Sequence, residues 1–166
     1  MRTNSQTPKD PNTQGPNHLK KSSVVDFTDA GSSRGEEEFW ADGDGSALHE
    51  EFNDGQPYDL EERTARFGEA IIRFAKRIPR GPGNNRLIDQ LVGAATSVGA
   101  NYCEADEGVS RKDFKKSIGT CKKEARETKF FLRMVATAEE DLKPEARRLW
   151  IEAKQLHLIF CSLYRK

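Results

Sequence analysis

The chain has 166 residues, which is the size of one domain, and its 27 basic side chains balance its 27 acidic ones. The two signs are segregated, because residues 1–57 carry a net charge of −6 and residues 58–166 a net charge of +6. No apolar run approaches the ~18 residues of a membrane helix, and the first residues hold no apolar stretch typical of a secretory signal. The sequence therefore predicts a cytoplasmic protein with an acidic tail, a basic domain and no membrane partner.

Residues 1–57 have the composition of a disordered tail. They are rich in Pro, Gly, Ser, Asn and Asp, so they bury too little apolar surface to offset the entropy of ordering. Four hydrophobic side chains stand among glutamates in this tail: Phe39, Trp40, Leu48 and Phe52. The simplest interpretation is that these are scattered hydrophobic residues in a solvated tail. Two further hypotheses are open. One is a short acidic–aromatic docking motif, and the other is an acidic segment that lies over the domain's own basic surface and masks it.

The first helical pattern after the tail covers residues 59–78. Asp59 and Glu62 have the spacing of a capping box, and the apolar residues recur mostly every three, four or seven positions. The proline- and glycine-rich segment 79–83 ends this helix.

The second helical pattern covers residues 85–106, and its middle consists almost entirely of small residues. Two of them, Gly93 and Gly99, each cost about 1 kcal/mol relative to alanine inside a helix. Close approach of a neighbouring helix is the expected compensation. We therefore place this helix in the middle of the assembly.

Two longer apolar seams complete the domain. The third helix begins at Ser110, with Asp113 three residues later, and its apolar positions alternate spacings of four and three without a break. The fourth follows Leu142-Lys143-Pro144, with proline in the first turn, and repeats the same spacing. Four amphipathic helices with short loops and no strand pattern predict an all-α fold. We expect an up-down antiparallel four-helix bundle over residues 58–166 with a disordered N-terminal extension.

A polar stripe runs along the second helix, and the third helix adds a pair of glutamates. We predict that these side chains form an inter-helix hydrogen-bond layer that fixes the register of the bundle: Gln90, Ser97, Asn101, Glu104, Glu124 and Glu127. The alternative is a carboxylate metal site from Glu104, Glu124 and Glu127. Di-iron bundles need Glu-x-x-His on two helices, whereas the histidine of the domain, His157, follows Lys154 by three positions. We therefore predict no metal and no cofactor.

The third helix carries an excess of positive charge. Residues 109–133 hold nine basic against three acidic side chains, and most of the basic ones lie off the apolar seam. We predict that they line an outer face that binds nucleic acid: Arg111, Lys112, Lys115, Lys116, Lys122, Lys123, Arg126 and Lys129. The alternative is an ordinary solvated helix face. Phe130 and Phe131 are expected in the core, which leaves this face without a ring to stack on bases, so binding should follow the backbone or shape of the nucleic acid.

The sequence contains no recognisable catalytic constellation. Gly81-Pro82-Gly83 follows a helix and not a strand, and no Gly-Lys-Ser/Thr comes after it, so it is not a phosphate loop. A single histidine in the domain argues against Ser/His/Asp and Cys/His arrangements. Cys103, Cys121 and Cys161 lack Cys-x-x-Cys spacing and lie in helical patterns, which is typical of small buried thiols in a reducing cytoplasm. We therefore expect a protein that is not an enzyme.

Four stretches of the domain form a recognisable set: Tyr58-Asp59-Leu60-Glu61-Glu62-Arg63-Thr64, Ala94-Ala95-Thr96-Ser97-Val98-Gly99-Ala100-Asn101, Ser110-Arg111-Lys112-Asp113-Phe114 and Lys123-Glu124-Ala125-Arg126-Glu127-Thr128. They resemble the bacterial four-helix bundle proteins of the 23S ribosomal RNA intervening-sequence family. The resemblance covers about residues 57–166.

The resemblance implies a compact bundle that assembles as a ring-shaped homopentamer and has no established catalytic residues. Relatives include the accessory protein of diversity-generating retroelements, a basic protein that works with a reverse transcriptase and nucleic acid. Two functions are compatible with these features. In the first, a non-enzymatic oligomer contacts RNA, or a ribonucleoprotein such as a reverse-transcriptase complex, through the basic third helix. In the second, the chain is a structural or protein-interaction scaffold without a nucleic-acid ligand.

Overall fold

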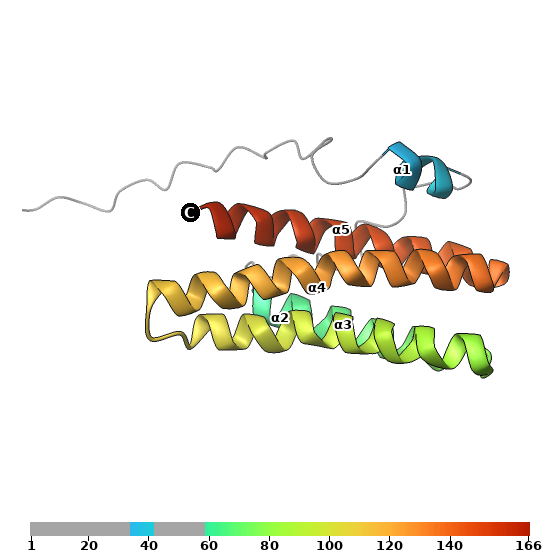
Figure 1. Ribbon diagram of the computed structural model, residues 1–166, viewed down its shortest axis with the longest axis horizontal. Coiled ribbons are helices and arrows are strands. Elements are labelled where there is room, and N and C mark those ends of the chain that lie inside the picture. Colours follow the sequence, from blue (N-terminus) through green and yellow to red (C-terminus); the bar gives the residue numbers. More distant parts are fainter. Residues whose placement is uncertain (1–33, 42–58) are drawn as a thin grey trace, which may run out of the picture.

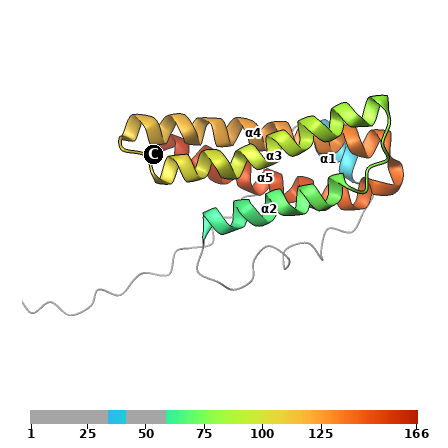
Figure 2. The ribbon, with the colours of Figure 1, turned by 90° about the horizontal axis from the view of Figure 1, so that it is seen from below.

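The computed structural model describes residues 34–41 and 59–166, and this part of the chain contains helices and no strand. The helices are α1 (Arg34–Trp40), α2 (Leu60–Ala75), α3 (Pro82–Asp106), α4 (Arg111–Ala138), the 3-10 turn η1 (Glu140–Leu142) and α5 (Lys143–Arg165). The four long helices run alternately up and down, each beside the one before it, and α5 closes the bundle against α2 (Figure 1 and Figure 2). The predicted all-α four-helix bundle is therefore confirmed. None of the described helices is long and apolar enough to cross a membrane.

The helices begin where capping residues satisfy their first N–H groups. The Asp59 side chain accepts a hydrogen bond from the Glu62 backbone N–H at 3.1 Å, and the Ser110 hydroxyl accepts one from the Asp113 backbone N–H at 3.1 Å. The second long helix begins earlier than predicted, because α3 starts at Pro82 and not at residue 85. Proline suits a first helical position, since its fixed φ is helical and its missing N–H has no partner to lose there.

The core is formed by the apolar seams of the four long helices. Its largest fully buried hydrophobic side chains are Phe67, Phe74, Phe160, Ile71, Leu91, Ile118, Leu132 and Leu156. Ile78 is also buried, although it lies in the turn after α2 and not in the helix as predicted. Complete burial of a side chain of this size stabilises a fold by about 1.5–3 kcal/mol, so these contacts hold the helices in register.

Small side chains allow α2 and α3 to approach closely. A Cβ atom at Gly99 would lie 3.4 Å from Thr64 Oγ1, and one at Gly68 would lie 3.9 Å from Thr96 Cγ2. Gly99 therefore has the close helix contact that the sequence predicts. Gly93 does not, because a Cβ atom there would meet no other described atom within 4 Å. The cost of Gly93 in the helix is not offset by packing in this part of the chain.

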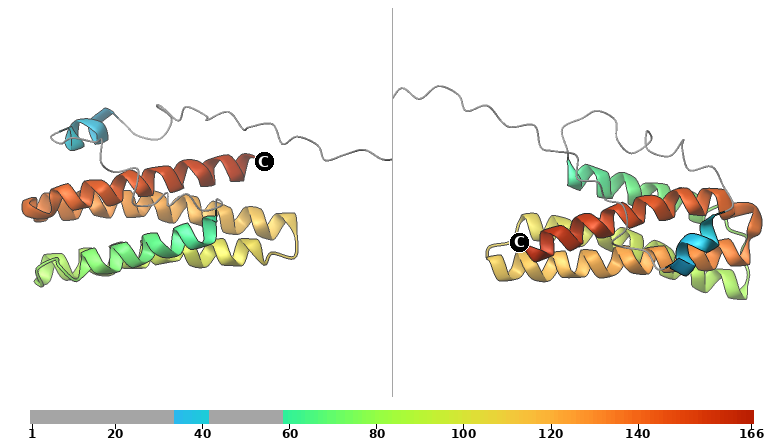
Figure 3. Two further views of the ribbon diagram at one scale, coloured as in Figure 1. Left: turned by 180° about the vertical axis from the view of Figure 1, so that it is seen from behind. Right: turned by 90° about the horizontal axis from the view of Figure 1, so that it is seen from above.

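One helix lies inside the segment that composition predicts to be disordered. α1 crosses the bundle near the end where α4 turns into α5 (Figure 3), and its Trp40 is buried in the core cluster. The prediction of disorder is therefore wrong for residues 34–40, because their aromatic side chains find partners on the bundle. Leu48 and Phe52 lie outside the described residues.

Candidate nucleic-acid interface

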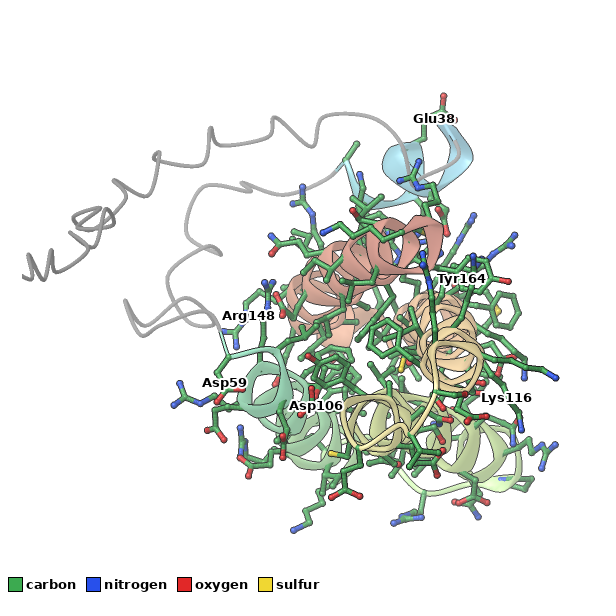
Figure 4. The ribbon with its side chains drawn as sticks, turned by 90° about the vertical axis from the view of Figure 1, so that its left-hand side faces the viewer. Glu38, Asp59, Asp106, Lys116, Arg148 and Tyr164 are labelled. Carbon is green, nitrogen blue, oxygen red and sulfur yellow. The ribbon has the colours of Figure 1, made fainter. Side chains whose placement is uncertain are left out.

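Most of the predicted basic residues on α4 face the solvent. Six of the eight are exposed and a seventh, Lys122, is half-buried; we call these seven the α4 cationic face: Arg111, Lys112, Lys115, Lys116, Lys122, Lys123 and Arg126. Figure 4 shows Lys116 on the same side of the bundle as Tyr164, and opposite Asp59 and Arg148. The helical spacing thus predicted the orientation of seven of these side chains correctly.

Local partners compensate only part of this charge. Lys123 Nζ lies 3.4 Å from Glu127 Oε1 and 3.5 Å from Glu124 Oε1, and its hydrogen bond to Glu127 is the main factor that raises the pKa of Lys123. Arg111 donates to the backbone carbonyl of Lys166. The other members form no ion pair with a described residue: Lys112, Lys115, Lys116, Lys122 and Arg126. Exposed ion pairs contribute little and are screened by salt, so the face remains strongly cationic.

Tyr164 places an aromatic ring in the middle of the α4 cationic face. The ring lies against Gly119 of α4, where a Cβ atom would come within 3.1 Å of Tyr164 Cε2. Lys122 Nζ is 4.5 Å and Lys115 Nζ is 5.2 Å from the centre of the ring, which is cation–π geometry. The residue remains 37% exposed. Sequence analysis missed it, although Gly119 lies between the two lysines at helical spacing and leaves room for a ring from a neighbouring helix.

Phe130 also differs from its prediction. It is 54% exposed, and its ring contacts that of Phe131 edge to face at 5.3 Å between centres. Phe131 packs against the core as expected. Successive residues of an α-helix point about 100° apart, so the side chains of an adjacent pair do not face the same seam. The prediction of a core position is therefore wrong for Phe130.

Lys129 does not belong to the exposed face. Only 2% of the residue is accessible, because α1 covers it, and its Nζ lies 3.2 Å from Glu36 Oε2 and 4.9 Å from the centre of the Trp150 ring. Burial lowers the pKa of Lys129, and Glu36 opposes this shift only in part. The predicted exposure of Lys129 is wrong because a segment distant in the sequence shields it.

The aromatic residues of α1 complete this contact. Phe39 lies 4.7 Å from the Arg133 guanidinium and 5.1 Å from Lys143 Nζ, measured from the ring centre. The rings of Trp40 and Trp150 are 5.7 Å apart. We call the bundle residues of this contact the α1 socket: Lys129, Arg133, Lys143 and Trp150. The structure confirms, for residues 34–40, the hypothesis that an acidic–aromatic segment lies on the domain's own basic surface.

The predicted inter-helix polar layer is wrong. Among the described residues, no hydrogen bond joins two of its members across α3 and α4: Gln90, Ser97, Asn101, Glu104, Glu124 and Glu127. Asn101 Nδ2 instead donates to the Ser97 carbonyl of its own helix at 2.8 Å, and Glu124 and Glu127 pair with Lys123. Short polar side chains find carbonyl partners in the preceding turn, so they do not need a neighbouring helix.

A buried ion pair that the sequence did not lead us to expect joins α2 and α5. Arg63 Nε and Nη2 donate to the two carboxylate oxygens of Glu152 at 2.6 and 2.8 Å, and Nη2 also donates to Gln155 Oε1 at 2.5 Å. Glu152 is 3% exposed. A signal for this pair exists in the sequence, because Arg63 and Glu152 each follow a core leucine, Leu60 or Leu149, by three positions. A charge at a core-facing position predicts a buried partner.

The three cysteines have different environments. Cys121 is buried and donates a weak hydrogen bond to the Val98 carbonyl at 3.5 Å, and burial raises its pKa to about 12. Cys103 is exposed and Cys161 is half-buried. The expectation of a buried thiol is therefore confirmed only for Cys121. The described residues contain no group of three His, Cys, Asp or Glu side chains that is placed to hold a metal ion.

His157 lies half-buried between α4 and α5, among the cationic residues. Burial lowers its pKa, and Lys129, Arg126 and Lys122 lower it further, whereas Glu36 acts in the opposite direction. The folded-state pKa is thus below the value of about 6.5 for an unfolded histidine. As the pH falls through about 6.5, the unfolded chain therefore binds a proton at His157 before the folded chain does. The free energy of unfolding decreases as a result, until the pH reaches the lower pKa of the folded state.

This shift predicts an acid-sensitive bundle. Between pH 7.5 and 5.5 the melting temperature should fall, with His157 contributing at most about 1.4 kcal/mol per pH unit. The His157→Gln variant should show a smaller fall, because its side chain does not titrate. Thermal unfolding followed by circular dichroism at both pH values checks this. An equal fall in melting temperature for the native chain and the variant would contradict the prediction.

Comparison with known proteins identifies the domain. The model of the family described as 23S rRNA-intervening sequence protein matches residues 58–156. The chain belongs to this family. A crystal structure of a protein with unknown function from the S23 ribosomal protein family of Bacteroides thetaiotaomicron is similar in fold, with a TM-score of 0.59 and 20% sequence identity over 65% of this chain and 100% of that one. Among curated proteins, none matches the chain.

The match of the 23S rRNA-intervening sequence protein family includes the whole α4 cationic face. α1 and Tyr164 lie outside the matched residues, because α1 precedes them and Tyr164 follows them.

Proposed function

We propose that this chain is a non-enzymatic RNA-binding protein whose ligand lies along the α4 cationic face. The observation that carries the proposal is the gathering of seven basic side chains on one face of α4, around the partly exposed ring of Tyr164. Five of them form no ion pair with a described residue, so their charge is available to phosphates.

The chemistry of this face favours the backbone of the nucleic acid over its sequence. Lysine and arginine neutralise phosphates and release condensed counterions, which yields affinity without base readout. The Tyr164 ring, held by Lys115 and Lys122, adds a stacking surface for an unpaired base, an interaction worth about 1–3 kcal/mol. The proposed ligand is thus RNA with at least one unpaired base, bound with strong salt dependence and little sequence preference.

Phe130 favours a second candidate function, that of a self-assembling scaffold. The residue is 54% exposed on α4, and aromatic side chains are enriched at interfaces between proteins. The homopentamer implied by the family resemblance would cover it. In this alternative the cationic face serves assembly and has no nucleic-acid ligand.

Protection of individual lysines tests the proposed function. We expect a short single-stranded RNA to reduce acetylation of Lys112, Lys115, Lys116 and Lys122, measured by mass spectrometry, because phosphates would cover their amines. Lys76, which is exposed at the end of α2, is the internal control and should keep its reactivity. Unchanged reactivity of the four lysines at saturating RNA, or equal protection of Lys76, would contradict the proposal.

A further inference from the structure

The α1 contact leaves buried polar atoms without partners. The indole nitrogens of Trp40 and Trp150 are both buried, and neither donates a hydrogen bond to a described acceptor. Trp150 as a whole is only 4% exposed. Because a buried N–H without an acceptor is unfavourable, α1 does not fully satisfy the surface on which it lies. A ligand that brings an acceptor oxygen to Trp150 Nε1 would satisfy this N–H group.

The side chains of α1 resemble a nucleotide in kind, because they combine an anion with flat rings. The α1 socket offers the complementary groups, which are cations and an aromatic ring. Two cations flank the Trp150 ring, with Lys129 Nζ at 4.9 Å and Lys154 Nζ at 5.7 Å from its centre. The other two cations of the socket, Arg133 and Lys143, lie 4.7 and 5.1 Å from the centre of the Phe39 ring of α1. In α1, the Glu36 carboxylate meets Lys129, the Phe39 ring meets Arg133, and the Trp40 ring meets Trp150. An anion beside flat aromatic groups is also what a nucleotide presents.

The socket continues the α4 cationic face. Along α4, Lys122, Arg126 and Lys129 are spaced by four and three residues and share one side of the helix, and all three act on the pKa of His157. Along α5, Tyr164 and Trp150 lie on the corresponding side, about 21 Å apart at 1.5 Å per residue. A strip with an aromatic ring near each end therefore runs along both helices, and α1 covers one of these ends.

α1 is a weak cover. It has seven residues, whereas isolated helices shorter than about 12–15 residues are marginal in water. Its attachment depends on Trp40, on the Phe39 ring and on an ion pair to a lysine whose burial is unfavourable. Segments of this kind open locally at a free energy well below that of global unfolding.

We propose that the α1 socket is a second nucleic-acid site, which takes an unpaired base and its phosphate and which α1 occupies in the free protein. This inference rests on the proposed function of the α4 cationic face. When α1 leaves, Trp150 provides the stacking surface, and Lys129, Arg133 and Lys143 bind the phosphate. Single-stranded RNA and α1 then compete for the same end of the strip.

Substitutions in α1 of the full chain test the competition. Glu36→Gln and Trp40→Ala should each release α1, which raises the acetylation of Lys129, and should each strengthen binding of a short single-stranded RNA about tenfold. Glu38→Gln is the matched control, because it removes the same charge from a side chain that points away from the bundle (Figure 4). It should change neither quantity.

A second set of variants distinguishes a true site from a simple release of negative charge. Adding Arg133→Gln and Lys143→Gln to Glu36→Gln should abolish the gain in RNA affinity. Exposure of Lys129 in the released variants without a gain in RNA affinity would overturn the second site. In that case, protection of Lys115 by RNA would show that the proposed function of the α4 cationic face still holds. If no variant binds RNA but the released variants bind a synthetic peptide of residues 34–41, the socket is a protein docking site and both proposals are overturned.

Discussion

Glu152→Ala should destabilise the bundle by about 3–5 kcal/mol, the range for removing one partner of a buried ion pair. The substitution leaves the Arg63 guanidinium in the interface between α2 and α5 without the carboxylate that binds both Nε and Nη2. The Glu152 side chain is 4% exposed and that of Arg63 is 17% exposed, so water replaces the carboxylate poorly. Chemical denaturation followed by circular dichroism measures the loss.

An exposed ion pair within α2 provides the control for this prediction. Arg73 and Glu69 lie 3.3 Å apart with about two-thirds of each side chain exposed, so Glu69→Ala should cost less than about 1 kcal/mol. The double variant Arg63→Ala/Glu152→Ala should lose less stability than the sum of the single variants, because neither charge is then left without its partner. A loss for Glu152→Ala no larger than that for Glu69→Ala would show that the buried pair does not hold α2 to α5.

Reversing four charges on the α4 cationic face should weaken RNA binding at least about 100-fold at roughly 50 mM salt. The variant carries Lys115→Glu, Lys116→Glu, Lys122→Glu and Lys123→Glu, so it removes four phosphate partners and places repulsive charges beside Tyr164. Fluorescence anisotropy with a labelled single-stranded RNA measures the change. The substituted side chains lie outside the core, so the variant should keep its helicity.

A matched variant separates local contacts from net charge. Reversal of four exposed cations around the α2–α3 turn changes the total charge equally and should weaken binding far less: Arg73, Lys76, Arg80 and Arg86. Equal losses in both variants would mean that RNA responds to overall charge and not to the α4 cationic face. A change of oligomer mass in light scattering, with RNA affinity unaltered, would favour the scaffold and contradict the proposed function.

Local patterns were sufficient to predict the bundle. The seam of α4 alternates spacings of four and three, and its members Ile118, Cys121, Ala125 and Leu132 are all fully buried. Capping residues marked the starts of α2 and α4. By contrast, α1 was not predictable from its own residues, because so short a helix depends on contacts such as that between Trp40 and Trp150, which lie 110 positions apart.

The candidate site was predictable only where one helix determines it. Helical spacing placed most basic residues of α4 on its outer face. The covering of Lys129 by Glu36 and the position of the Tyr164 ring over Gly119 both depend on how distant segments pack, and spacing within one helix does not contain this information. The same limit explains the incorrect polar layer, because Asn101, Glu124 and Glu127 pair within their own helices.

The salt dependence of RNA binding is the most direct test of the central claim, that α4 presents a phosphate-binding face. For single-stranded RNA each neutralised phosphate adds about 0.7 to the slope of log affinity against log salt concentration. The native full chain should give a slope of roughly −4, and the fourfold lysine-to-glutamate variant a slope shallower by about 3. A native slope near zero, or the same slope in both proteins, would contradict it.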